Sequence, residues 1–261
     1  MDIIVCVKQV PDTTEVKIDP KTNTLMREGV PSIVNPFDAN AVELALQLRE
    51  RYGGKVTVIS MGPPQAMEAL RECIAMGCDE AVLLSDRAFG GADTWATSYT
   101  LATAIAKIGK YDMILCGKQA IDGDTAQVGP GVAEHLGLPQ VTYIRSAELQ
   151  GDKAVVERVV DDGHEVIEVS LPFVATVTKD VSLEPRLPSM KGTMKAYKAN
   201  IPVWGAADID ADPKRIGLNG SATQVRRVFS PQRKGKGEIL KGDIEEIAKT
   251  VAAKLREATL I

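Results

Sequence analysis

The chain has 261 residues, of which 44% are hydrophobic, 25% charged and only 4% aromatic. This composition is typical of a folded globular protein and excludes a disordered or fibrous one, and an aliphatic core favours parallel strands covered by helices. The net charge of −4 is unevenly spread, because residues 179–261 carry 16 Lys and Arg against 10 Asp and Glu. Almost no aromatic residues accompany these basic ones, so the basic region indicates a protein partner rather than nucleic acid.

The sequence also argues against a membrane protein, a metalloprotein and a catalytic subunit. It enters an apolar strand pattern at once, with no basic leader and no apolar stretch of membrane-spanning length, so we expect a cytoplasmic protein. The four cysteines have no C-x-x-C spacing, and we expect neither a metal centre nor a disulfide. Neither of the two histidines has an obvious nucleophile, so we expect no catalytic residues.

In the first half of the chain, short apolar runs alternate with helical stripes, which predicts an α/β fold with a mainly parallel sheet. We expect helix N-caps at Asp38 and Asp93 and helix ends near Gly53, Gly77 and Gly137. A small hairpin is expected within residues 15–27, inside the first crossover. The expected strands are residues 3–7, 55–60, 80–84 and 112–116.

From residue 140 the pattern changes to strand alternation between turns, which predicts an antiparallel meander of residues 141–149, 154–160, 166–170 and 173–178. Residues 180–242 show little periodicity, and such a stretch is too long for a loop of a compact domain. An amphipathic helix follows the expected cap Asp243. We therefore divide the chain into an α/β nucleotide-binding domain, residues 1–200, and a C-terminal arm and helix, residues 201–261, that wrap a partner.

A glycine-rich run from Gly117 to Pro130 follows the fourth expected strand and leads into a helix. Amides at a helix N-terminus and closely approaching glycine backbone are what a phosphate group needs. The run matches neither the P-loop nor the dinucleotide fingerprint, so NTP hydrolysis is not indicated. Asp122 and Asp124 would repel a pyrophosphate, so one of them must cap the helix or face a ribose hydroxyl or solvent. A glycine-rich turn with an Asp cap would produce the same pattern.

Three further segments sit at the ends of expected strands or next to them: Val7 to Asp12, Asn35 to Asp38 and Ser60 to Pro63. Because open α/β sheets bind ligands outside the carboxyl ends of their strands, the three could together wall an adenosine pocket. Taken singly, each has an ordinary structural explanation: Asn35-Pro36 as a turn, Asp38 as a cap and Met61 as part of the core.

In order and spacing, Val7 to Asp12, Asn35 to Asp38 and Ala75-Met76-Gly77-Cys78-Asp79 resemble segments of the beta subunit of electron-transfer flavoproteins, and so does the run from Gly117 to Pro130, which is highly specific. The resemblance implies a heterodimer whose alpha subunit holds a redox FAD, while the beta subunit binds AMP or, in one branch, a second FAD. The cofactor-binding residues that it implies are Cys6, Val7, Lys8, Asn35, Pro36, Phe37, Asp38, Ser60, Met61, Gly117, Lys118, Gln119, Ala120, Ile121, Asp122, Gly123, Asp124, Thr125, Ala126, Gln127 and Val128.

The turn Pro11-Asp12-Thr13-Thr14 and the run Asp122-Gly123-Asp124 resemble the anaerobic bacterial branch with two FADs. That likeness implies electron bifurcation, in which NADH reduces the beta-bound FAD and the electrons part toward the alpha FAD and toward ferredoxin or flavodoxin. A plain carrier with structural AMP is the alternative. A universal-stress-type adenine-nucleotide-binding module is more distant, because it gives no reason for the long arm.

The family resemblance further implies a loop after the meander, residues 180–201, that docks an acyl-CoA dehydrogenase. In the family an exposed apolar residue flanked by lysines makes this contact. Here the apolar residue aligns with Leu187 or Met190, and the lysines are Lys191, Lys195 and Lys198.

Overall fold

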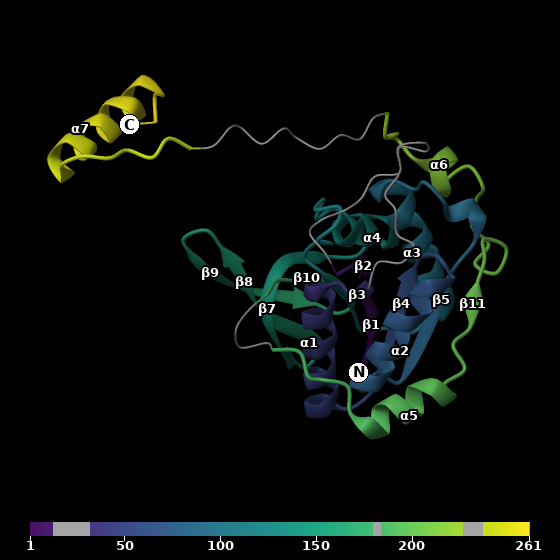
Figure 1. Ribbon diagram of the computed structural model, residues 1–261. Coiled ribbons are helices and arrows are strands. Elements are labelled where there is room, and N and C mark those ends of the chain that lie inside the picture. The colour runs from purple at the N-terminus through teal and green to yellow at the C-terminus, as the bar shows by residue number, and fades with distance from the viewer. Residues whose placement is uncertain (13–31, 180–183, 227–236, 261) are drawn as a thin grey trace. The chain divides into compact units, whose positions relative to one another are not determined.

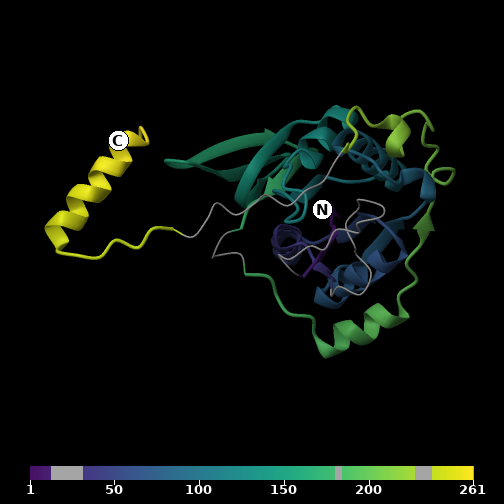
Figure 2. The ribbon, with the colours of Figure 1, turned by 45° about the horizontal axis from the view of Figure 1, so that its top comes forward.

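The computed structural model describes residues 1–12, 32–179, 184–226 and 237–260. Contacts divide the chain into two compact units, Met1–Arg226 and Arg227–Ile261. In the first unit a nine-stranded sheet lies between two helical layers (Figures 1 and 2). One face is covered by α1 (Pro36–Tyr52) and α2 (Met67–Met76), and the other by α3 (Thr94–Ile108) and α4 (Val128–Leu136). The expected α/β fold with a mainly parallel sheet is therefore confirmed.

The strand order of the sheet is β11-β5-β4-β1-β6-β10-β7-β8-β9. All neighbours from β11 to β7 are parallel, whereas β8 pairs antiparallel with both β7 and β9. A separate antiparallel pair joins β2 to β3. The strands are β1 Asp2–Cys6, β2 Gln9–Pro11, β3 Ser32–Val34, β4 Lys55–Met61, β5 Glu80–Leu84, β6 Met113–Gly117, β7 Gln140–Gln150, β8 Lys153–Val160, β9 Gly163–Ser170, β10 Phe173–Val177 and β11 Val203–Trp204.

Helices begin and end largely where the sequence predicts. The carboxylate of Asp93 caps α3 by accepting from the amides of Trp95 and Ala96, and Gly53, Gly77 and Gly137 follow α1, α2 and α4. The predicted cap at Asp38 is wrong: α1 begins at Pro36 after Asn35, which leaves Asp38 inside the first turn. The helices are α1 Pro36–Tyr52, α2 Met67–Met76, α3 Thr94–Ile108, α4 Val128–Leu136, α5 Met190–Lys198, α6 Gly217–Gly220 and α7 Ile244–Glu257, with 3-10 turns at Pro64–Ala66 and Arg87–Phe89.

Two local predictions need correction. The last predicted meander strand, β10, instead inserts between β6 and β7 and is parallel to both, because its fully buried and mostly apolar side chains suit the centre of the sheet. The stretch expected to be irregular contains α5, β11 and α6. It also buries Ile201, Ile209 and Ile216 in the first unit, so apolar residues without local periodicity still contribute to the core.

The hairpin predicted within residues 15–27 lies outside the described residues, although β2 and β3 stand on either side of it. In the second unit, Asp243 caps α7 as predicted, by accepting from the amide of Glu245. Within the described residues, no helix is both long and apolar enough to span a membrane, and no cluster of His, Cys, Asp or Glu could hold a metal ion.

Candidate nucleotide-binding site

The predicted site segments meet at the carboxyl ends of three neighbouring strands. Cys6 of β1 lies in register with Cys116 of β6 on one side and with Ile59 of β4 on the other. The chain leaves these strands through Lys8, Gly117 and Met61 respectively, so the three following loops emerge side by side. The N-terminus of α1 reaches the same edge. All four sequence segments are therefore brought together.

Asp38 joins three of these segments. Its buried carboxylate accepts hydrogen bonds from the amide of Lys8, at 2.7 Å, and from the amide of Gly117, at 3.0 Å. A Cβ on residue 117 would lie 2.2 Å from Oδ1 of Asp38, so only glycine permits this approach. Burial raises the pKa of Asp38 to about 7, while these hydrogen bonds oppose the rise. The side chain thus organises the strand ends.

Asn35 performs the same function for the glycine-rich loop. Its side chain is fully buried, donates from Nδ2 to the carbonyl of Gln119 at 2.8 Å and accepts at Oδ1 from the amide of Ile121 at 3.2 Å. Its own amide donates to the carbonyl of Lys8 at 2.9 Å. Because a buried amide side chain must satisfy its polar groups, these contacts fix the path of the loop.

The two acidic residues of the loop have cationic or amide partners. Nζ of Lys8 lies 2.6 Å from Oδ1 of Asp122, and Nε2 of Gln119 donates to Asp124. The N-cap residue of α4 is Gln127, so neither Asp122 nor Asp124 caps this helix, and Asp122 is not an isolated charge. The adjacent ammonium group offsets its repulsion of an anion, which removes the objection that the sequence raised to phosphate binding here.

The loop itself has the features of an anion cradle. Asp124 and Ala126 have left-handed φ values of 54°, which is uncommon away from glycine and concentrates at ligand sites. Among the described residues, the amides of Thr125, Ala126 and Gln127 have no hydrogen-bond acceptor in the protein. They immediately precede α4, so the positive end of that helix adds to their field.

Glycines of α4 serve packing. A Cβ at Gly129 would lie 2.4 Å from Cγ2 of Thr176 in β10, and one at Gly131 would lie 2.5 Å from Oγ of Ser98 in α3. These contacts let the helix approach both neighbours closely. The Gly129-Pro130-Gly131 run therefore does not need a dinucleotide to explain it.

The described residues fit a nucleotide in one further respect. Ser60, at the end of β4, is buried and its hydroxyl has no hydrogen-bond partner among the described residues. An orphaned hydroxyl costs roughly 1–3 kcal/mol, and its presence at a predicted contact residue is consistent with a missing polar partner.

A second group of predicted residues lies elsewhere, on α5 and the segment before it. Leu187 and Met190 are 88% and 86% exposed, and the three predicted lysines are exposed as well. Two residues that the sequence reasoning missed extend this apolar surface along α5, Met194 and Tyr197, which are also exposed. Their spacing from Met190, four and seven residues, is the signal that identifies one helix face.

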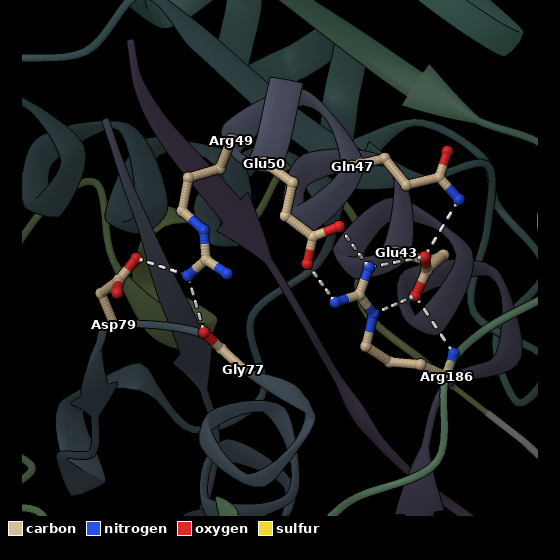
Figure 3. A network of polar contacts seen from close by, with 7 residues as sticks. All are labelled: Glu43, Gln47, Arg49, Glu50, Gly77, Asp79 and Arg186. Carbon is tan, nitrogen blue, oxygen red and sulfur yellow. Dashed lines mark hydrogen bonds and ion pairs between the residues drawn. The ribbon is translucent and has the colours of Figure 1, made fainter. Parts of the chain in front are cut away.

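A polar network that the sequence reasoning also missed attaches this segment to α1. The guanidinium of Arg186 contacts both Glu43 and Glu50, and Gln47 donates to Glu43 at 3.0 Å (Figure 3). Arg186 lies more than 130 residues from both Glu43 and Glu50 in the chain. No short-range pattern could have revealed it.

The fold and the strand-end site define an α/β protein with a candidate nucleotide cradle, and comparison with known proteins identifies its family. Residues 22–209 match the electron transfer flavoprotein domain. The chain therefore belongs to the electron-transfer flavoprotein family, as a beta subunit, and the family implies an alpha-subunit partner and an association with flavin.

Three relatives span essentially the same length. The caffeyl-CoA reductase-Etf complex subunit CarD of Acetobacterium woodii is 56% identical and covers 100% of both chains. The electron transfer flavoprotein subunit beta of Clostridium acetobutylicum is 54% identical over 98% of both chains. The acryloyl-CoA reductase electron transfer subunit gamma of Anaerotignum propionicum is 44% identical over 100% of both.

Proposed function

We propose that this chain binds FAD at the carboxyl ends of β1, β4 and β6 and serves, with its alpha subunit, in flavin-based electron bifurcation in the cytoplasm. The observation that carries the nucleotide proposal is the loop before α4, where the amides of Thr125 to Gln127 have no acceptor in the part of the chain that the structure describes and where Asp122 pairs with Lys8. Two relatives are named as subunits of caffeyl-CoA reductase and acryloyl-CoA reductase systems, and these names support the bifurcating branch.

In this proposal different segments of the chain contact the adenosine and the phosphates of the nucleotide. Cys6 to Lys8, Asn35 to Asp38 and Ser60-Met61 line the adenosine, and Gly117 to Val128 holds the phosphates through backbone amides. Lys8 keeps the cradle from becoming too negative for a pyrophosphate. When bound, FAD supplies hydride acceptance from NADH and onward transfer of electrons toward the alpha FAD and toward ferredoxin or flavodoxin. AMP in the same cradle would leave a plain carrier.

Two surfaces serve partners in this proposal. The exposed apolar residues Leu187 and Met190, with Lys191, Lys195 and Lys198 around them, dock an acyl-CoA dehydrogenase that has a complementary acidic rim. The C-terminal arm wraps the alpha subunit, since within its own unit α7 buries none of its residues and its apolar stripe needs a partner.

The test is to denature the co-purified heterodimer and to identify and count the nucleotides released. Two FADs per heterodimer, with NADH-dependent ferredoxin reduction coupled to acyl-CoA reduction, are expected. One FAD and one AMP without NADH oxidation would leave only the plain carrier. A colourless, folded single chain that binds ATP would instead favour the universal-stress-type module.

A further inference from the structure

The segment that carries Leu187 and Met190 is attached to the protein on both sides. Before it, Arg186 contacts α1, and after it, Gly192 of α5 contacts the end of α2. The two exposed apolar side chains stand between these anchors. This arrangement matters because a docking segment that is already ordered loses less conformational entropy when a partner binds.

The first anchor is the Arg186 network (Figure 3). Nε of Arg186 lies 2.8 Å and Nη2 lies 3.0 Å from the two carboxylate oxygens of Glu43, and the amide of Arg186 donates to Glu43 at 3.1 Å. Glu50, two turns further along α1, accepts from the same guanidinium. Glu43 is buried, so both the backbone and the side chain of Arg186 are fixed by a carboxylate that itself needs this cation.

The second anchor is the contact of α5 with the segment Ala75 to Asp79. The carbonyl of Ala75 accepts from the amide of Ser189 at 3.4 Å, and a Cβ at Gly192 would lie only 2.1 Å from this carbonyl oxygen. No side chain fits at that distance, so α5 keeps its place only with glycine at 192. Nζ of Lys195 adds a hydrogen bond to the carbonyl of Cys78 at 3.2 Å.

Helix α1 also contacts the segment Ala75 to Asp79, against which α5 packs. Nη1 of Arg49 in α1 donates to the carbonyl of Gly77 at 2.8 Å and to Asp79 at 2.9 Å (Figure 3). Through Glu43 and Glu50, α1 also contacts Arg186, just before the segment with Leu187 and Met190. Helix α1 is thus common to both anchors. This also gives a structural role to Ala75 to Asp79, a run that is not among the predicted cofactor-binding residues.

We propose that Arg186 and Gly192 are positioning residues that hold Leu187 and Met190 in the orientation in which a partner protein docks. The inference rests on the proposed docking role of this segment. Neither residue needs to touch the partner. Arg186 and Gly192 keep Leu187 and Met190 in place before the partner arrives. Replacing either positioning residue should therefore weaken docking because the segment moves, not because a contact with the partner is lost.

The experiment uses the intact heterodimer carrying Arg186→Lys or Gly192→Ala, because lysine cannot reproduce the forked contact and alanine forces α5 away from Ala75. Matched controls are Arg51→Lys, at an exposed pair with Glu148, and Gly163→Ala, where a Cβ meets no atom of the described residues within 4 Å. Electron transfer is measured to an acyl-CoA dehydrogenase and, separately, to a small redox dye that needs no docking.

We expect KM for the dehydrogenase to rise roughly three- to tenfold in both variants, with dye reduction, nucleotide content and the controls unchanged. Leu187→Ala should raise KM by a smaller factor in either variant than in the wild type, because both substitutions act on the same docking segment. An unchanged KM, or an equal loss with the dye, would overturn the inference. If Lys191→Glu and Lys198→Glu also leave KM unchanged, the proposed docking surface itself is wrong.

Discussion

The ammonium nitrogen of Lys8 lies 2.6 Å from Oδ1 of Asp122, although 114 residues separate the two in the chain. The Asp122 side chain is only 9% exposed, whereas that of Lys8 is 42% exposed. Water therefore solvates the carboxylate less than the ammonium group, and loss of the ion pair should affect Asp122 more than Lys8. The pair joins the loop after β1 to the loop after β6. It therefore contributes to the charge that a phosphate would meet in the proposed cradle.

Replacing Lys8 by Met removes the positive charge beside Asp122, so the carboxylate should repel a bound phosphate more strongly. We expect nucleotide affinity to fall on the order of tenfold, a modest figure because the exposed lysine is screened by solvent. Asp122→Asn added to Lys8→Met should recover most of the loss. Isothermal titration of the nucleotide-depleted heterodimer measures both, and equal affinities for all variants would contradict the prediction.

The glycine-rich loop offers a test that separates ligand approach from protein packing. Within the described ranges, a Cβ at Gly123 would meet no atom closer than 4 Å, so Gly123→Val is compatible with the surrounding protein. We expect it to expel the nucleotide by blocking the approach of the backbone, and Thr125→Glu to do so by charge repulsion. Nucleotide released on denaturation is the measurement, with Gly163→Val as the control. Stoichiometric nucleotide in both loop variants would contradict the cradle.

Asp38 predicts a pH dependence of stability. Burial raises its pKa from 3.8 to about 7, so the folded protein binds this proton more tightly than the unfolded chain does. Its contribution to the free energy of unfolding is complete below about pH 4 and is lost as the pH rises through about 7.

Asp38→Asn removes this titration. The free energy of unfolding of the variant minus that of the wild type should therefore rise between about pH 4 and 7 and level off above, by at most about 1.4 kcal/mol per pH unit. Urea unfolding of the heterodimer across this pH range measures the difference. Only its change with pH tests the prediction, because the substitution can also shift the free energy of unfolding equally at every pH. Asp161→Asn, at an exposed turn, is the control. A difference that does not vary with pH would show that Asp38 is ionised throughout.

The lysines of α5 predict an electrostatic contribution to partner docking. Reversal of Lys191, Lys195 and Lys198 to Glu should slow association with the dehydrogenase by roughly tenfold or more at low salt and flatten its dependence on ionic strength. Lys195 also holds α5 to Cys78, so the double variant of Lys191 and Lys198 isolates the charge effect. Stopped-flow mixing measures the rate, and Lys214→Glu is the control. Identical rates at every salt concentration would assign the segment another role.

The fold class, most element boundaries and the segments of the candidate site could be predicted from local patterns in the sequence. Alternating apolar runs and helical stripes depend on residues a few positions apart, so β5 at Glu80–Leu84 and the cap at Asp93 could be predicted. The glycine-rich run after Cys116 was visible for the same reason.

Which distant residues meet could not be predicted from the sequence and is known from the folded structure. Asp38 resembles a cap locally, yet it binds the amides of Lys8 and Gly117, because its helix begins two residues earlier and brings it to the strand ends. The place of β10 between β6 and β7 follows from packing in the centre of the sheet. The contact of Arg186 with Glu43 spans 143 residues. Such contacts are set by the arrangement of whole elements in space, which no local pattern in the chain encodes.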